Sequence, residues 1–125
     1  MNTPEGILCA RTHEWVLEEK NEVLIGLTDW QASQMGDIVS VDLPETDSEF
    51  SKDEIFATVE SVRMACELYM PVAGKIVEVN EELINSPDLI NEDSYSNWLV
   101  KVQPQDFQRD SEGLIEYIDY IDEVS

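Results

Sequence analysis

The chain has 125 residues, of which 42% are hydrophobic, and its 7 lysine and arginine residues face 28 aspartate and glutamate residues, a formal net charge of −21. This length suits one domain with a single core, and the hydrophobic content is too high for a disordered acidic tail. The negative charge argues against nucleic acids and anionic membranes as partners, because both attract proteins through lysine and arginine.

Most of the chain predicts β-structure. Strands are predicted by hydrophobic alternation or β-branched content in segments 7–17, 22–28, 37–43, 54–61, 64–70, 75–79 and 98–102. Residues 45–54 predict a polar connection, and residues 81–97 predict a loop with one helical turn. Short strands separated by turn residues are typical of small sandwiches and barrels. Similar acidic-flanked strands before residue 62 and after Gly74 suggest two similar half-sheets that face one another.

A short internal helix is predicted after the first two strands. Thr28, followed three residues later by Gln31, is a capping-box pattern, and Gly36 is a typical helix stop. We therefore expect a helix over residues 29–35, with Trp30 and Met35 facing the core.

The C-terminal segment predicts an amphipathic helix over residues 111–124, with Ser111 as its N-cap. Its hydrophobic residues recur at helical spacing: Leu114, Ile118 and Ile121. The other face is acidic and is expected to be solvated. The predicted organisation is one domain over residues 1–125, with a β core at 6–104 and this helix laid against it.

Few residues suggest catalysis. His13 is the single histidine, and nothing near it in the sequence suggests a nucleophile or a metal-ligand spacing. Cys9 and Cys66 lie in strand-like segments, which favours buried small side chains over a disulfide. No glycine-rich phosphate loop is present. These features indicate a binding or carrier protein that is not an enzyme and holds no metal.

The compartment is predicted from what the N-terminal segment lacks. It has neither the basic start and hydrophobic run of a signal peptide nor the composition of a transit peptide. No hydrophobic run approaches membrane-spanning length. We therefore expect a monomer in the reducing cytoplasm.

Residues 60–74, ESVRMACELYMPVAG, predict two strands joined by a tight turn that carries Val62 and Arg63. Carrier domains display the lysine that receives lipoate or biotin on such a hairpin, because the attachment point must be exposed and must be supported by a rigid sheet. The alternative interpretation is an ordinary exposed arginine.

Several motifs cover nearly the whole chain in order: THEWV at 12–16, IGLTDW at 25–30, MGDIVSVDLPE at 35–45, VESV at 59–62, LYMPVAGKIVEVNEEL at 68–83, SPDLINED at 86–93 and WLVKVQP at 98–104. Together they resemble the glycine cleavage system H-protein family. The resemblance implies a mostly β barrel-sandwich hybrid with a short internal helix and a C-terminal helix. It also implies a lipoyl carrier whose partners are glycine decarboxylase, aminomethyltransferase and dihydrolipoyl dehydrogenase.

The sequence departs from the family at the attachment position. The family pattern is E-S-V-K, and here the four residues are Glu60, Ser61, Val62 and Arg63. Lipoylation needs a free amine, whereas the arginine side chain stays charged and is a poor nucleophile. We therefore predict that lipoate, the cofactor of the family, is not covalently bound to this chain.

The resemblance also implies a groove near the hairpin in which the loaded arm is sheltered. Its matching positions are Thr12, Glu14, Gln34 and Glu67, and the alternative interpretation of each is a solvated polar side chain. Gln34 and Trp30 stand where some members have histidine. Residues 91–102 lack the proline-bearing turn of the family.

Three hypotheses follow from these residues. The first is a regulatory or scaffolding H-protein paralogue without the arm. The second is an ordinary carrier in which Arg63 is an introduced Lys→Arg change, or a carrier of another lipoate-linked pathway. The third is thiol chemistry at Cys66, three residues from Arg63.

Overall fold

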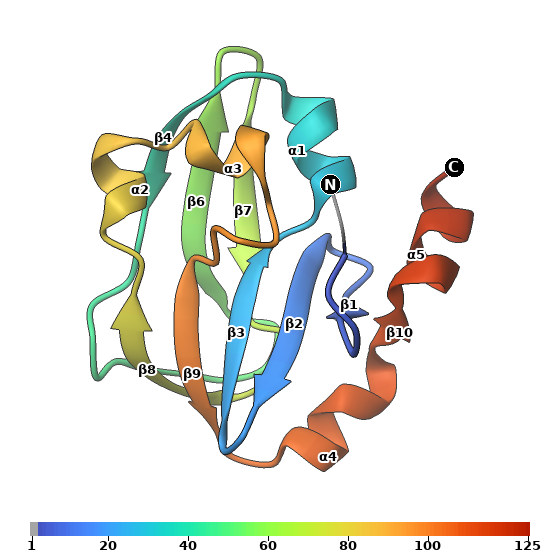
Figure 1. The fold of residues 1–125 in the computed structure, drawn as a ribbon. Coiled ribbons are helices and arrows are strands. Elements are labelled where there is room, and N and C mark those ends of the chain that lie inside the picture. The colour runs from blue at the N-terminus through green and yellow to red at the C-terminus, as the bar shows by residue number, and fades with distance from the viewer. Residues whose placement is uncertain (1–2) are drawn as a thin grey trace.

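The computed structural model describes residues 3–125, in which the strands form two antiparallel sheets (Figure 1). The strands are β1 (Leu8–Cys9), β2 (Glu14–Glu19), β3 (Glu22–Leu27), β4 (Ile38–Asp42), β5 (Glu49–Phe50), β6 (Ile55–Ser61), β7 (Ala65–Tyr69), β8 (Gly74–Val79), β9 (Val100–Pro104) and β10 (Ile115–Glu116). One sheet has the order β10-β1-β2-β3-β9-β8-β5 and the other the order β4-β6-β7. The predicted β class is confirmed.

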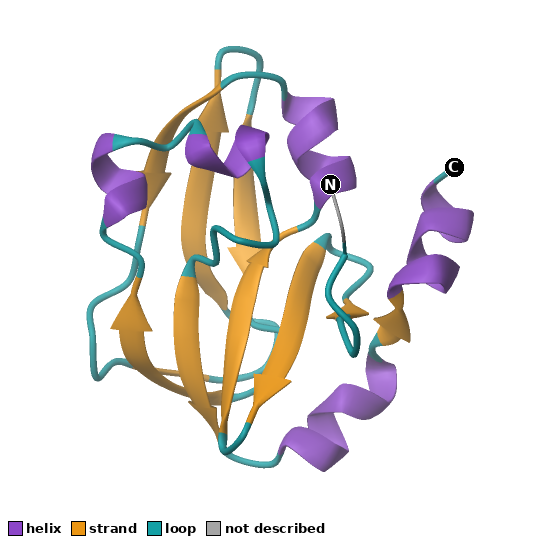
Figure 2. Cartoon of the chain, in the orientation of Figure 1, coloured by secondary structure: helices purple, strands orange, loops and turns teal. Residues whose placement is uncertain are grey.

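Helices lie around the sheets (Figure 2). They are α1 (Asp29–Met35), α2 (Glu82–Asn85), α3 (Leu89–Glu92), α4 (Phe107–Asp110) and α5 (Tyr117–Val124), with a 3₁₀ turn at Ser111–Gly113. None of the helices within residues 3–125 is long and apolar enough to cross a membrane.

The main core fills the space between the two sheets. Ile25 and Val102 of the larger sheet belong to the same buried cluster as Val59 and Leu68 of the smaller one. Burial of such side chains is the main stabilising contribution. The hairpin of β6 and β7 extends from this core, so its turn lies at one end of the molecule (Figure 1).

The structure confirms the predicted internal helix. The Thr28 hydroxyl accepts a hydrogen bond from the Gln31 amide at 3.2 Å, and Gly36 ends the helix with a φ of 76°. Met35 is fully buried, whereas Trp30 is half-buried against a second hydrophobic cluster. A local cap and a glycine stop were sufficient to predict both ends.

The predicted strand at residues 7–17 is interrupted. Residues 10–13 form a turn in which the His13 amide donates to the Ala10 carbonyl at 2.9 Å. His13 has a φ of 81°, a conformation that does not continue a strand. β1 therefore keeps only two residues.

The predicted helix at 111–124 begins later than expected. Ser111 is the C-cap of α4 and not an N-cap, and Ile115 pairs with Cys9 as part of β10. This pairing covers an edge of β1 that would otherwise be open. The helix itself, α5, starts only at Tyr117.

Two other expectations were incomplete. The polar connection at 45–54 contains β5, which pairs with β8, and the segment at 81–97 contains both α2 and α3. The strands on either side of the hairpin do not form similar half-sheets, because β6 belongs to the three-stranded sheet and β8 to the seven-stranded one.

Candidate functional site

The turn between β6 and β7 is tight and internally bonded. The Ser61 amide donates to the Met64 carbonyl at 2.8 Å, and the Ser61 hydroxyl accepts from the amides of Arg63 and Met64 at 3.1 and 3.2 Å. These bonds hold the backbone in one conformation. The side chains of Val62, Arg63 and Met64 are exposed at the turn.

Arg63 lies back over the end of α1. Its Nη1 donates to the Gln34 carbonyl over 3.4 Å, and its Nε would be 3.3 Å from a Cβ atom placed on Gly36. A cation beside the carbonyl end of a helix interacts favourably with the partial negative charge there. The arginine is thus held against the protein and does not extend freely from it.

The segment beneath Arg63 is also fixed by other elements. The Val62 amide donates to the Asp37 carbonyl at 3.2 Å. Asn91 of α3 donates through Nδ2 to the Gly36 carbonyl and accepts from the Ile38 amide through Oδ1, both at 2.9 Å. The hairpin, α1 and α3 therefore meet at the start of β4.

Glu14 is fully buried beside the hairpin. Its Oε1 accepts from the Thr12 hydroxyl, and its Oε2 accepts from the Tyr69 amide of β7 at 2.9 Å. Burial raises the pKa of Glu14, and these hydrogen bonds only partly offset the increase. The carboxyl group links β2 to β7.

Cys66 of β7 lies close to Glu14 and Glu67. Burial raises the pKa of the Cys66 thiol and the two carboxylates add to the increase, although the Gln31 amide, which donates to Sγ over 3.5 Å, opposes it. A reactive cysteine needs a lowered pKa. This environment does not activate the thiol.

The four predicted groove positions are only partly brought together. Thr12 donates a hydrogen bond to Glu14, and both Glu14 and Glu67 lie near Cys66. Gln34 instead lies at the end of α1, where its backbone carbonyl accepts from Arg63. The sequence did not indicate the contacts that four residues make at this site: Gln31, Tyr69, Gly36 and Asn91. Gly36 had a detectable signal as a helix stop, whereas the other three act through contacts that are distant in sequence.

Hydrogen bonds from tyrosine hydroxyls connect the C-terminal segment to the N-terminal end of α1. Asp29 accepts hydrogen bonds from Tyr95 at 2.7 Å and Tyr117 at 2.8 Å. Tyr120 bonds Thr28 at 2.8 Å and His13 Nδ1 at 2.7 Å. Burial lowers the pKa of His13. The contacts of His13 therefore indicate a structural role in holding Tyr120.

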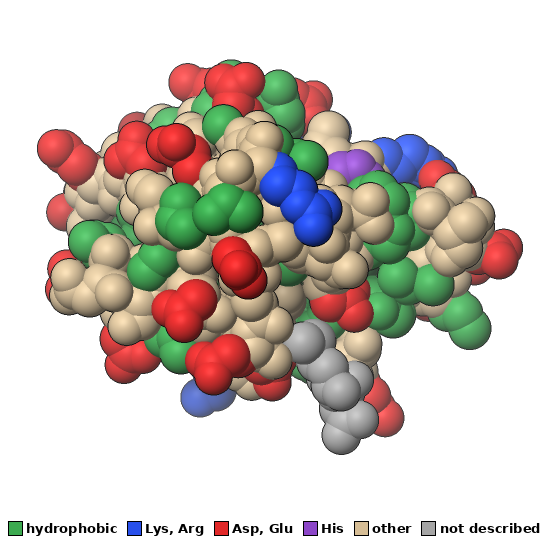
Figure 3. Space-filling model, turned by 90° about the horizontal axis from the view of Figure 1, so that it is seen from above, with side chains coloured by type: hydrophobic (Ala, Val, Ile, Leu, Met, Phe, Trp, Pro, Cys, Tyr) green, Lys and Arg blue, Asp and Glu red, His purple; other side chains and the backbone are tan. Residues whose placement is uncertain are grey.

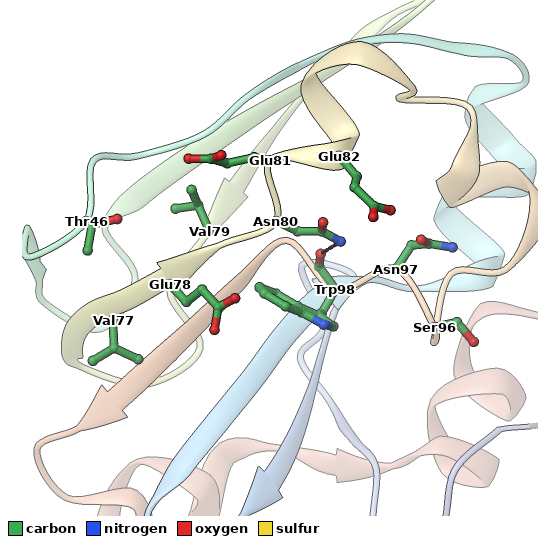
Figure 4. A pocket seen from close by; sticks show the side chains of 10 residues that line it. All are labelled: Thr46, Val77, Glu78, Val79, Asn80, Glu81, Glu82, Ser96, Asn97 and Trp98. Atoms are coloured by element: carbon green, nitrogen blue, oxygen red, sulfur yellow. Dashed lines mark hydrogen bonds between the residues drawn. The ribbon is translucent and has the colours of Figure 1, made fainter.

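A hollow of about 590 Å³ opens near the end of β8 (Figure 4). Glu78, Glu81 and Glu82 lie around it with Trp98, and the Asn80 side chain donates to the Trp98 carbonyl at 2.8 Å. None of the predicted groove residues lines it. Across residues 3–125, no group of three or more histidine, cysteine or acidic side chains is arranged to hold a metal ion.

Comparison with known proteins identifies the family. The model of the glycine cleavage H-protein family matches residues 8–125. The chain belongs to this family. It is 48% identical to the glycine cleavage system H protein of Alkaliphilus oremlandii over 103 aligned residues. The alignment covers 82% of this chain and 81% of the relative. The chain is 41% identical to the glycine cleavage system H protein of Halothermothrix orenii over 128 residues, with 99% of each covered.

A solved structure supports the same assignment. The glycine cleavage system H protein from Mycobacterium marinum superposes with a TM-score of 0.85 at 29% identity, covering 98% of both chains. The expected barrel-sandwich fold is therefore confirmed. H-proteins are lipoyl carriers without catalytic activity of their own, so family membership also confirms the prediction of a carrier-type protein.

Proposed function

We propose that this chain is an H-protein that docks on the enzymes of glycine cleavage but carries no lipoyl arm, and that it acts there as a regulator or scaffold. The observation that carries the proposal is Arg63 at the tip of the β6–β7 hairpin, the position of the family's lysine. Its guanidinium group is always charged near neutral pH and offers no free amine. The residues present do not fit a lipoyl amide.

The surroundings of Arg63 are consistent with a site that has lost the arm. Arg63 contacts Gly36 and the Gln34 carbonyl, so its side chain lies along the protein surface. Glu14, a groove position, is fully buried and both of its carboxyl oxygens accept hydrogen bonds from the protein. In this structure neither oxygen is exposed to an incoming amine.

Two alternatives keep the carrier role. In one, the natural residue at position 63 is lysine and Arg63 is an introduced change. In the other, the chain serves another lipoate-linked pathway. The family assignment is compatible with both. They differ from the proposal because they predict that Arg63→Lys restores a working lipoyl carrier. All three place the protein in the cytoplasm, with glycine decarboxylase, aminomethyltransferase and dihydrolipoyl dehydrogenase as the partners to test first.

The first experiment measures modification. The chain and its Arg63→Lys variant are incubated with a lipoate ligase, lipoate and ATP, and their intact masses are compared. We expect a lipoyl-sized increase in the variant alone. An increase in the unchanged chain that maps to residues 60–70 would overturn the proposal.

The second experiment measures carrier function. Arg63→Lys, once lipoylated, is added to the three partner enzymes, and glycine decarboxylation is followed. Our proposal of a specialised paralogue predicts docking with little turnover. Full turnover would favour an ordinary carrier with an introduced arginine.

A further inference from the structure

Within residues 3–125, Arg63 differs from most basic side chains in having no carboxylate partner. Five of the seven lie within 3.8 Å of a carboxylate oxygen: Arg11, Lys52, Lys75, Lys101 and Arg109. In the part of the chain that the structure describes, Arg63 and Lys20 have no such ion pair. In a protein with 28 acidic residues, an exposed and unpaired arginine has a free face for an incoming carboxylate.

Exposed hydrophobic side chains flank Arg63 in the turn, and another lies at the bulge of β4. Val62 is 71% exposed, Met64 is 42% exposed, and Val39, which lies in the bulge of β4 opposite the end of β6, is 54% exposed. Figure 3 views this end of the molecule and shows hydrophobic and basic side chains together, with acidic ones scattered around them. Arginine and methionine are enriched at protein interfaces, and arginine is enriched among the residues that contribute most to binding.

The backbone that presents these side chains is already ordered. The Ser61 hydroxyl holds the amides of Arg63 and Met64, and the Val62 amide is bonded to the Asp37 carbonyl. Gly36 and the Gln34 carbonyl restrict the guanidinium group. This turn would therefore lose little conformational entropy when a partner binds, which favours binding.

We propose that Val62, Arg63 and Met64 form a docking surface for a protein partner that presents a recessed carboxylate between hydrophobic side chains. The carboxylate pairs with Arg63, and the hydrophobic side chains cover Val62 and Met64. The net charge of −21, with Asp37 and Glu60 exposed nearby, requires the rim of the partner site to be basic or neutral. This inference deepens the proposed function, on which it rests, by stating what the armless hairpin binds.

The test measures binding to purified glycine decarboxylase, aminomethyltransferase and dihydrolipoyl dehydrogenase by titration calorimetry. Arg63→Met removes the charge and keeps a long side chain, and we expect it to weaken binding to at least one enzyme tenfold or more. Val62→Ser should weaken the same complex by at least threefold. Lys20→Met is the matched control, since Lys20 also has no ion pair within residues 3–125 and lies in the turn between β2 and β3. The affinity of this variant should stay within twofold of the unchanged chain.

The outcomes separate this inference from the proposed function. If the unchanged chain binds an enzyme and both Arg63→Met and Val62→Ser bind equally well, the docking surface is wrong and the proposed function stands. If the unchanged chain binds none of the three enzymes, both are overturned. A concentration-dependent dimer that Arg63→Met abolishes would show that a second copy occupies the surface, and would also overturn the inference.

Discussion

The guanidinium group of Arg63 lies against Gly36, a residue 27 positions earlier in the chain, so closely that a Cβ atom at Gly36 would be 3.3 Å from Arg63 Nε. Gly36 has a φ of 76° and a ψ of −151°, a conformation that is essentially restricted to glycine. One residue thus ends α1, starts the path into β4 and makes room for Arg63.

Replacing Gly36 should destabilise the protein and displace Arg63. Because an L side chain is strained at this φ and also crowds the guanidinium group, we expect Gly36→Ala to lower the free energy of unfolding by about 1–3 kcal/mol. Urea denaturation measures the loss. Gly113→Ala is the matched control, since a Cβ there meets nothing within 4 Å, and it should change stability by less than about 0.5 kcal/mol. Equal losses in the two variants would contradict the proposed contact.

Glu14 should make stability depend on pH. Burial raises its pKa above the ordinary value of 4.5, so the folded protein holds this proton more tightly than the unfolded chain. The resulting contribution to stability is fully present below the unfolded pKa and is lost as the pH rises through the folded pKa. Glu14→Gln removes this titration, and we expect its stability relative to the unchanged protein to be higher at pH 8 than at pH 4.

Urea denaturation at the two pH values measures this difference. Glu18→Gln, an exposed change on the same strand, controls for the loss of one negative charge. The stability difference between Glu14→Gln and the unchanged protein should vary with pH more than that of Glu18→Gln. Equal variation, or none, would argue against a raised pKa of the buried Glu14.

Tyr117 should anchor α5 to α1. Its hydroxyl donates to Asp29 at 2.8 Å, and Tyr117→Phe removes this bond to a charged group, so we expect a loss of about 1.5 kcal/mol. Amide hydrogen exchange should increase across residues 115–124 more than in β3. Ile118→Ala, at a side chain that is 73% exposed, should leave exchange in that segment nearly unchanged.

The two cysteines should differ in reactivity toward Ellman's reagent. Cys9 is fully buried and burial raises its pKa to about 12, so we expect it to react only after unfolding. Cys66 is half-buried and should react slowly in the native protein. Glu67→Gln removes one of the charges that raise the Cys66 pKa and should increase its rate at pH 8, whereas Glu112→Gln, in the remote 3₁₀ turn, should not. A native Cys66 that reacts faster than an unfolded thiol would revive the hypothesis of thiol chemistry.

Signals contained within a few consecutive residues were predictable. The capping pair Thr28 and Gln31 indicated α1, and the turn at residues 62–63 indicated the hairpin that presents Arg63. Such features depend on hydrogen bonds between near neighbours and on side-chain periodicity, both of which are visible in the sequence.

The predictions that failed concern residues whose contacts are with residues remote in the sequence. Hydrophobic spacing alone suggested a helix from residue 111, but Ile115 pairs with Cys9 in a sheet. Likewise, the Glu14 carboxylate is buried because it meets the Tyr69 amide, 55 residues away. Long-range pairing overrides local propensity when it satisfies an open strand edge or a buried polar group.

By itself, the sequence determined the family, the β class and the presence of an arginine at position 63 of the predicted turn, because these depend on residue identity and order. Only the tertiary structure decided where its guanidinium group lies. Its position over Gly36 and its contact with the Gln34 carbonyl arise from the packing of the hairpin against the end of α1. That packing joins segments whose contact no local pattern encodes.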